Sequence, residues 1–169
     1  CAGDECGNFN LGIAGAAVTG RIAGENAASY VQNVEGASDE DLLNSEVVRN
    51  ACAFYSQLME RKEGATWKEL NIAVQQIMSD YCGIINPRSE SMLSAGLNNL
   101  ELLEKRAKTS VYCANSHELM RALESFDLLE MGKLVITVCR ERRESRGMHK
   151  RSDYTFTNPL LNDMFMTVK

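Results

Sequence analysis

The chain has 169 residues, which is the length of about one domain, and 44% of them are hydrophobic and 24% charged. This composition excludes a disordered or low-complexity chain. The net charge of −5 argues against an extended nucleic-acid interface, and no apolar run reaches the roughly 18 residues that a membrane helix needs.

The first 35 residues divide into a polar loop and a segment of small residues. Residues 1–10 are glycine-rich and polar, which predicts a loop. Residues 11–34 are dominated by glycine and alanine and predict a helix, although each glycine costs up to about 1 kcal/mol there. Close packing on a sheet, or backbone approach to a ligand at the helix start, would justify that cost. We therefore interpret residues 1–35 as the edge of an α/β structure and expect a large N-terminal part before Cys1.

From residue 36 the pattern changes to amphipathic helices separated by short turns. Capping signals and apolar spacings of three and four predict helices over 38–62, from 66 to the breakers Gly83 and Pro87, over 88–112 and over 116–145. Gly147 is the expected stop of the last helix. The predicted fold is mainly α, an antiparallel helical bundle over 36–169 with an irregular tail from about 147 and a short strand at 164–168.

The apolar stripes of these helices predict which residues face the core. The predicted core residues are Leu43, Val47, Ala51, Phe54 and Leu58; Leu70, Val74, Ile77, Tyr81 and Ile84; Leu93, Leu97, Leu100, Leu103 or Glu104, Ala107 and Val111; and Leu119, Leu123, Phe126, Leu129, Leu134 and Val138.

The cysteines and histidines give little sign of a metal site. The six cysteines contain no Cys-x-x-Cys pair, and the chain has only two histidines. A structural zinc site needs four close nitrogen or sulfur ligands, so we expect no metal. We interpret the cysteines as free thiols rather than as a disulfide framework.

The densest group of charges lies at 140–154, where seven of fifteen side chains are cationic or can become so. A solvated helix end is one interpretation, since cations complement the negative end of the helix dipole. A domain-docking surface, in which arginines make paired hydrogen bonds to carboxylates, is another. A nucleic-acid patch is the weakest, because aromatic residues are not interleaved with the cations.

Two stretches carry a family resemblance. The first joins residues 1–6 (CAGDEC) to residues 19–28 (TGRIAGENAA), and the second is residues 143–154 (RESRGMHKRSDY). They resemble, in the same order, the end of the FAD-binding domain and the Arg-x-Glu-Ser-Arg-Gly-x-His-x-Arg-x-Asp-Tyr signature of the fumarate reductase and succinate dehydrogenase flavoprotein family. Residues 80–82 and 117–122 are more weakly similar to the adenylylsulfate reductase α-subunit branch.

The resemblance implies an FAD-dependent oxidoreductase, with residues 1–35 ending the FAD-binding domain and residues 36–169 forming the helical domain. It implies FAD binding by a carboxylate and by a helix start whose free N–H groups suit negative charge: Asp4, Leu11, Gly12, Ile13 and Ala14. It implies docking of the two domains by Arg143, Glu144, Arg146, His149, Arg151 and Asp153. The catalytic residues would precede Cys1, so we expect this chain alone to be inactive and to hold no FAD tightly.

The implied partners are the missing FAD-binding domain and an iron–sulfur or other electron-transfer subunit, with no nucleic acid and no transmembrane segment. We expect a cytoplasmic protein that can associate with a membrane through a partner subunit.

One departure from the family concerns the substrate. Members that handle dicarboxylates carry Asn-Arg-Leu-Gly shortly before the helix, and its arginine grips the substrate, whereas residues 8–12 here read Asn-Phe-Asn-Leu-Gly. A substrate carboxylate would lose charge-assisted hydrogen bonds, which argues against fumarate or succinate. Two alternatives stay open: an adenylylsulfate-reductase-like α subunit that acts on a sulfur substrate, and a helical interaction module without enzymatic activity.

Overall fold

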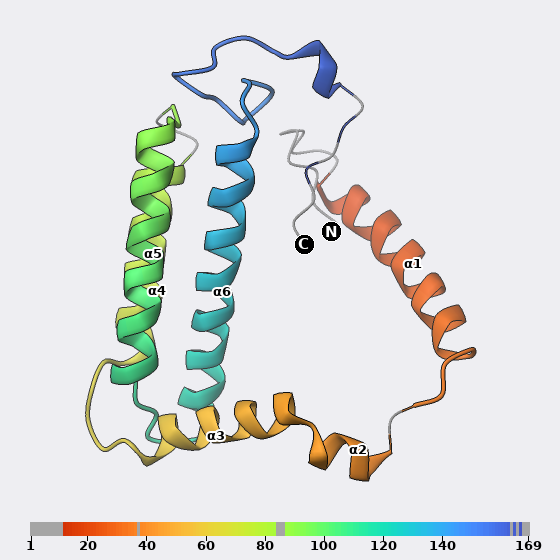
Figure 1. The fold of residues 1–169 in the computed structure, drawn as a ribbon, viewed down its shortest axis with the longest axis vertical. Helices are drawn as coiled ribbons and strands as arrows, with labels where there is room; N and C mark the ends of the chain where they lie inside the picture. Colours follow the sequence, from red (N-terminus) through yellow and green to blue (C-terminus); the bar gives the residue numbers. More distant parts are fainter. Residues whose placement is uncertain (1–11, 37, 84–86, 163, 165, 167–169) are drawn as a thin grey trace. The chain divides into compact units, whose positions relative to one another are not determined.

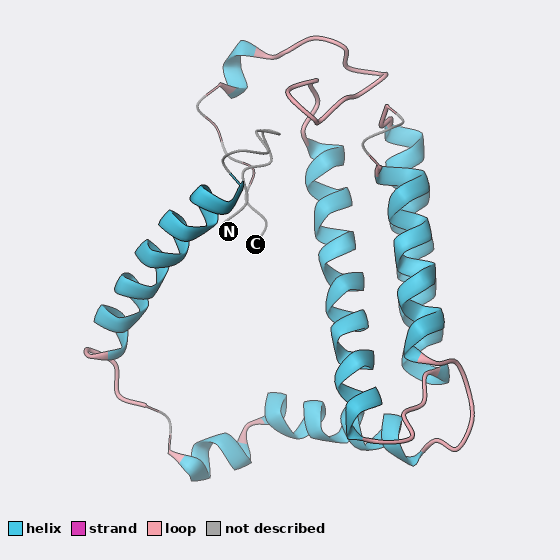
Figure 2. Ribbon diagram, turned by 180° about the vertical axis from the view of Figure 1, so that it is seen from behind, coloured by secondary structure: helices cyan, strands magenta, loops and turns pink. Residues whose placement is uncertain are grey.

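The computed structural model describes residues 12–36, 38–83, 87–162, 164 and 166. Within these ranges the chain forms six α-helices and a short 3-10 helix, and no strand (Figures 1 and 2). The expected mainly α fold is confirmed. The chain divides into two compact units, residues 1–50 and 51–169.

The first unit contains α1 (Gly12–Val31), α2 (Asp39–Asn44) and the start of α3 (Glu46–Glu60). The glycine–alanine segment is helical, as predicted, and the Asn26 side-chain amide donates to the Ile22 carbonyl at 2.8 Å, one turn back. Ser38 caps α2 as predicted, and it forms a capping box with Asp41 that was not predicted, in which each side chain accepts a hydrogen bond from the other residue's backbone N–H.

The single helix predicted over 38–62 is wrong, because the chain breaks at Ser45. Ser45 is extended, with φ −63° and ψ 125°, and its N–H donates to the Leu42 carbonyl to close α2. The break places Leu43 on a different helix from Leu58, so one helical period no longer relates their faces. Val47 shares α3 with Leu58, but it belongs to the first unit, whereas Leu58 lies in the core of the second. Leu43 and Val47, both predicted in the core, are 73% and 77% exposed, whereas Leu58 is fully buried.

The second unit is built on three long helices, α4 (Trp67–Cys82), α5 (Glu90–Ser110) and α6 (Ser116–Glu141). All three contact one another, and α5 runs antiparallel to its two neighbours (Figure 1). Each starts with a capping side chain: Thr66 in the predicted capping box with Glu69, Ser89, and Asn115. The buried apolar residues are Leu58, Leu70, Val74, Cys82, Leu93, Leu100, Ala107, Val111, Cys113, Ala122, Leu129, Ile136 and Cys139.

The end of α3 closes this core. The Cys113 N–H donates to the Leu58 carbonyl at 2.9 Å, and the ring of Phe54 meets that of Phe126 edge-on at 5.3 Å. Leu58 therefore lies in the core and Phe54 packs against it, as predicted, whereas the predicted core residues nearer the start of the helix do not. Among the described residues, no helix is both long and apolar enough to cross a membrane.

The buried face of α6 differs from the predicted stripe. Its buried residues are Ala122, Ser125, Leu129, Gly132, Ile136 and Cys139, so that only Leu129 of the predicted set is fully buried. Leu119, Leu123 and Phe126 pack at the margin of the core. Small residues share this face with Leu129 and Ile136 because α4 and α5 both pack against the helix; a Cβ at Gly132 would lie 3.1 Å from the Met78 Sδ and 3.2 Å from the Leu100 Cδ1.

The end of α6 was also predicted wrongly. The helix ends at Glu141 with Arg142 as its cap, not near Ser145. Gly147, expected to stop it, lies instead in a turn where the backbones of Arg146 and His149 exchange two hydrogen bonds of 2.8 and 2.9 Å. Its φ of 55° is in the left-handed region that favours glycine.

Gly96→Ala should destabilise the bundle at the contact between α4 and α5. A Cβ at Gly96 would lie 2.7 Å from the Cβ of Tyr81 and 3.2 Å from the Cδ1 of Ile136. Since the Tyr81 Cβ is fixed to its backbone, we expect a loss of about 1–3 kcal/mol in the free energy of unfolding, measured by urea denaturation.

Gly132→Ala is the matched control on α6. Its nearest neighbour would be the flexible Met78 Sδ at 3.1 Å, and alanine gains up to about 1 kcal/mol of helix propensity. We expect this variant to stay within about 1 kcal/mol of the parent. Equal unfolding free energies for the two variants would contradict the packing argument.

Candidate functional site

The segment that follows α6 folds back against the end of the bundle where α4 finishes and α5 begins. The Arg88 N–H donates to the Lys150 carbonyl, and the Ser152 N–H donates to the Arg88 carbonyl, both at 2.8 Å. Ser145 holds the segment together, since its hydroxyl accepts from the Arg151 N–H at 2.9 Å and donates to the Tyr154 carbonyl at 2.7 Å. The charged residues gathered here, which we call the arginine–carboxylate cluster, are Arg88, Glu90, Arg142, Glu144, Arg146, His149, Arg151 and Asp153.

Glu144 lies at the centre of one half of the cluster and is fully buried. Its Oε1 accepts from Arg142 at 2.7 Å and from the Nε of Arg146 at 3.0 Å, while Oε2 accepts from the Nη2 of Arg146 at 3.2 Å and from the backbone N–H of Asn158 at 2.8 Å. The Arg146 hydrogen bonds lower the pKa of Glu144 to about 2, and the Asn158 and Arg142 contacts act in the same direction against the effect of burial. The carboxylate is therefore charged and ties both arginines to residue 158.

Arg151 organises the other half. Its side chain is fully buried and makes a bidentate pair with Asp153, with both N–O distances 2.7 Å. Its Nη1 donates to the last carbonyls of α6, those of Cys139 and Arg140, at 2.9 and 3.0 Å. Asp153 in turn accepts from the Glu90 N–H at 2.8 Å, so one ion pair caps the end of α6 and the start of α5.

These contacts also set the charge of Asp153. Hydrogen bonds from Arg151 hold the pKa of Asp153 well below its usual range, and the Glu90 N–H adds to that effect against burial. The guanidinium lies over the ring of Tyr154, with 5.0 Å from its central carbon to the ring centroid.

His149 bridges the two sides of the cluster. Its Nδ1 lies 2.9 Å from the Nη1 of Arg88, and its Nε2 lies 2.9 Å from the Arg142 carbonyl. Because a guanidinium can only donate, Nδ1 must accept, and Nε2 carries the proton that is donated to the carbonyl. His149 is thus held as a single tautomer by partners on both ring nitrogens.

The structure brings together five of the six predicted docking residues: Glu144, Arg146, His149, Arg151 and Asp153. The sixth, Arg143, is exposed and forms no hydrogen bond or ion pair with any residue that the structure describes. Arg88 and Glu90 were missed by the sequence analysis. Nothing around them in the chain marks them as partners of residues 149–153, from which about sixty positions separate them.

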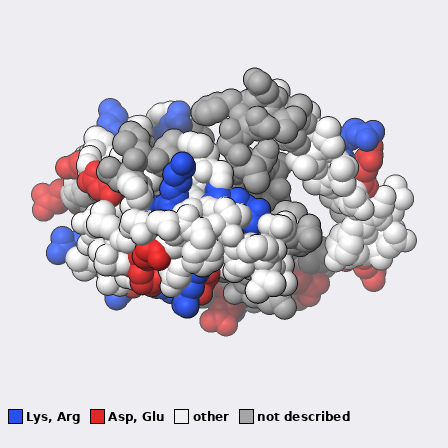
Figure 3. All heavy atoms as spheres, turned by 90° about the horizontal axis from the view of Figure 1, so that it is seen from above, with Lys and Arg blue, Asp and Glu red and all other residues white. Residues whose placement is uncertain are grey.

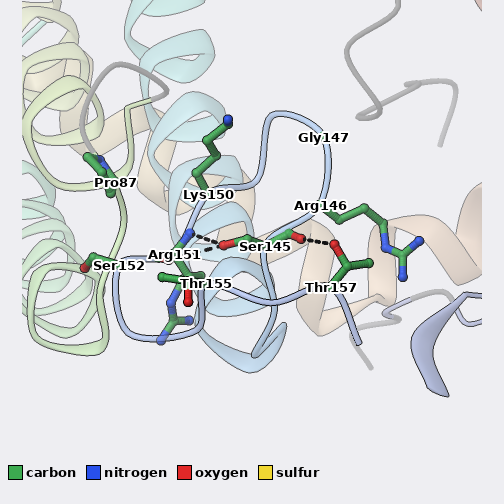
Figure 4. A pocket seen from close by; sticks show the side chains of 9 residues that line it. All are labelled: Pro87, Ser145, Arg146, Gly147, Lys150, Arg151, Ser152, Thr155 and Thr157. Carbon is green, nitrogen blue, oxygen red and sulfur yellow. Dashed lines mark hydrogen bonds between the residues drawn. The ribbon is translucent and has the colours of Figure 1, made fainter. Parts of the chain in front are cut away.

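The cluster borders a surface pocket of about 420 Å³. The pocket is lined by Pro87, Ser145, Arg146, Gly147, Lys150, Arg151, Ser152, Thr155 and Thr157 (Figure 4). Most of its polar groups already form hydrogen bonds within the protein. The Thr157 hydroxyl, for example, donates to the Ser145 carbonyl at 2.8 Å. In the space-filling view, basic side chains are scattered among acidic and uncharged ones (Figure 3).

The predicted FAD-binding residues lie in the first unit. Asp4 and Leu11 are outside the described residues, while Gly12, Ile13 and Ala14 are the first residues of α1. The first turn of α1 carries no acidic side chain, so no carboxylate within that turn can accept hydrogen bonds from its backbone N–H groups. No group of three His, Cys, Asp or Glu side chains that could hold a metal occurs in the described part of the chain.

Comparison with known proteins gives the chain a family. Residues 71–164, more than half of the chain, match the family described as fumarate reductase flavoprotein C-term. The chain is 27% identical over 142 residues to the fumarate reductase flavoprotein subunit of Haemophilus influenzae, which covers 82% of this chain and 23% of that protein.

Two solved structures share the fold. The Mycobacterium smegmatis Sdh1 complex is 25% identical, with a TM-score of 0.70 over 89% of this chain and 25% of that one. Adenylylsulfate reductase of Archaeoglobus fulgidus is 24% identical, with a TM-score of 0.67 over 83% of this chain and 24% of that one. The chain therefore spans about a quarter of the length of these relatives. It belongs to the family of fumarate reductase flavoprotein C-terminal domains, whose members are flavin-dependent oxidoreductases.

Proposed function

We propose that this chain is the helical C-terminal part of an FAD-dependent oxidoreductase and packs on the FAD-binding domain through the segment that carries the arginine–carboxylate cluster. The observation that supports this most is the buried Glu144, which fixes an irregular surface segment by holding two arginines and the Asn158 backbone. Hydrogen bonds rather than an apolar core hold this segment together, and Arg143 is exposed beside it. A hydrogen-bonded polar surface, with a guanidinium that bonds none of the residues the structure describes, suits a carboxylate or carbonyl on another domain.

The proposal includes a cofactor role for the start of the chain. The N–H groups of Gly12, Ile13 and Ala14 would face negative charge on the flavin, which the absence of an acidic side chain in the first turn of α1 supports. Asp4 and Leu11 belong to the same proposed site. When bound, the flavin supplies the hydride acceptor and donor, and this chain supplies dipoles that orient and stabilise it.

The proposed organisation has residues 1–35 completing the FAD-binding domain and residues 36–169 forming the helical domain. In this proposal the substrate is not a dicarboxylate bound by the arginine that dicarboxylate-handling members carry, because residues 8–12 contain no arginine. An electron-transfer subunit, iron–sulfur or other, is the proposed partner. Separated from the FAD-binding domain, the chain would neither retain FAD nor turn over.

The test compares two exposed arginines in the protein that carries this chain together with its FAD-binding domain. Arg143→Ala should release FAD several-fold faster on dilution, because the docking contact is lost, while thermal unfolding of the helical part is unchanged. Arg106→Ala is the matched control, since Arg106 is exposed near the opposite end of α5. FAD release is followed by its fluorescence.

Arg146→Ala separates docking from folding. It should lower both activity and thermal stability, because it removes the principal partner of Glu144. Equal rates of FAD release from Arg143→Ala and Arg106→Ala would refute the docking role of Arg143. A colourless full-length protein that cannot be reconstituted with FAD would instead favour a helical interaction module.

A further inference from the structure

Positive charge gathers around the pocket shown in Figure 4. Residues 140–153 contain six lysines and arginines and three aspartates and glutamates, in a chain whose net charge is −5. Three of these cations line the pocket together with four hydroxyl side chains, and no carboxylate occurs among the lining residues that the structure describes. Because a cleft lined by one sign of charge attracts ligands of the other sign, the pocket favours an anion.

Two of the cations at this pocket are not neutralised by a carboxylate. Lys150 lines the pocket, and its side chain forms no hydrogen bond or ion pair with any residue in the described ranges. Arg88 follows the lining residue Pro87, and its N–H donates to the Lys150 carbonyl at 2.8 Å. The guanidinium of Arg88 donates to neutral groups, the Cys82 carbonyl at 3.1 Å and the ring of His149 at 2.9 Å. Two uncompensated positive charges therefore lie on neighbouring stretches of backbone.

The two arginines that line the pocket already hold carboxylates of this chain. Arg151 makes its bidentate pair with Asp153, and Arg146 donates through Nε and Nη2 to Glu144. A planar carboxylate ligand, which pairs best with a guanidinium fork, would have to compete with these two side chains. The ammonium group of Lys150 is a compact point charge, which suits the tetrahedral oxygens of a phosphate. The donors that remain therefore favour phosphate over carboxylate.

We propose that this pocket binds a small molecule through a phosphate group. The ammonium group of Lys150 supplies the charge, and the hydroxyl of Thr155, which has no hydrogen-bond partner among the described residues, donates to a phosphate oxygen. The pocket volume of about 420 Å³ lies in the range of small-molecule sites and leaves room for the organic group that carries the phosphate. Arg143, which is proposed to contact the FAD-binding domain, does not line the pocket, so the two proposals stand or fall separately.

An NMR titration of the full 169-residue chain tests the proposal. Inorganic phosphate or glycerol phosphate is added to the isotope-labelled chain, with sodium chloride keeping the ionic strength constant. We expect saturable shifts of the backbone amide signals of Gly147, Lys150 and Thr155, and unchanged signals near Lys105, toward the other end of α5. Glycerol phosphate should bind at least as tightly as inorganic phosphate. Binding of inorganic phosphate alone would exclude the organic group and overturn the proposal.

Single substitutions assign the donors, and circular dichroism verifies that each variant is folded. Lys150→Met removes the charge but keeps an unbranched side chain, and it should weaken glycerol phosphate binding about tenfold, because a charge-assisted hydrogen bond is lost. Thr155→Val keeps the shape and should weaken binding about threefold. The control Lys105→Met removes an exposed lysine of α5 and should bind as the parent does. The proposal is overturned if neither phosphate compound gives saturable shifts, if Lys150→Met binds as tightly as Lys105→Met, or if the dicarboxylate malonate binds more tightly than both.

Discussion

Arg151→Ala is expected to lower the free energy of unfolding by about 4 kcal/mol, the largest effect of any single substitution in the cluster. It leaves Asp153 without its bidentate partner and removes the donor to two carbonyls that end α6. It also empties the space under the ring of Tyr154. Breaking a buried ion pair from one side costs about 3–5 kcal/mol, and the side chain of Arg151 is fully buried. Urea denaturation measures the loss.

Two further substitutions, Arg151→Lys and Arg143→Ala, are compared with Arg151→Ala for their effect on the free energy of unfolding. Lysine keeps the charge but cannot reach a bidentate carboxylate and two carbonyls at once, so about half of the loss should remain. Arg143 lies in the same segment, is exposed, and should change the unfolding free energy by less than about 0.5 kcal/mol when replaced by alanine. If Arg151→Ala were no more destabilising than Arg143→Ala, the capping role of Arg151 would be excluded.

Glu144→Ala is expected to cost about 3 kcal/mol. The substitution leaves Arg142, Arg146 and the Asn158 N–H without their common acceptor, although both guanidinium groups retain contact with water at 22% and 30% exposure. Glu141→Ala is the control, because Glu141 is half exposed and its nitrogen–oxygen distance to Arg140 is 3.6 Å. Equal denaturation midpoints for the two variants would contradict the proposed role of Glu144.

The pH dependence of stability gives a second measure of Glu144. Its folded pKa of about 2 lies below its ordinary value of 4.5, so its charge stabilises the fold above about pH 4.5, and this stabilisation is lost as the pH falls toward 2. Glu144→Gln has a similar shape and no charge. Its thermal midpoint should therefore fall less than that of the parent between about pH 5 and pH 2, and parallel curves would count against the buried carboxylate.

The sequence determined the features that depend on neighbours within one helical turn. The capping hydroxyl of Ser38 and the capping box of Thr66 were predicted because a cap lies within three residues of the backbone N–H groups that it serves, and Asn115 marked the start of α6 for the same reason. Residues 1–6, 19–28 and 143–154 together indicated the family, since a sequence motif can be recognised without its surroundings in the fold. The mainly α fold and the approximate positions of α4, α5 and α6 followed from capping signals and apolar period, whereas the break at Ser45 and the end of α6 at Glu141 did not.

The tertiary structure alone decided which residues meet. Leu43 and Val47 fitted an apolar period, yet both are exposed: Ser45 separates Leu43 from α3, and Val47 lies in the part of α3 that belongs to the first unit rather than to the core of the second. The core face of α6 combines small residues with Leu129 and Ile136 because α4 and α5 both pack against it, and the sequence of α6 alone does not contain that constraint. Arg88 reaches His149, and Arg151 reaches the α6 carbonyls, only once α4, α5 and α6 have aligned their ends. A hydrogen bond needs donor and acceptor within about 3 Å, and over tens of residues that distance is set by packing, not by spacing in the chain.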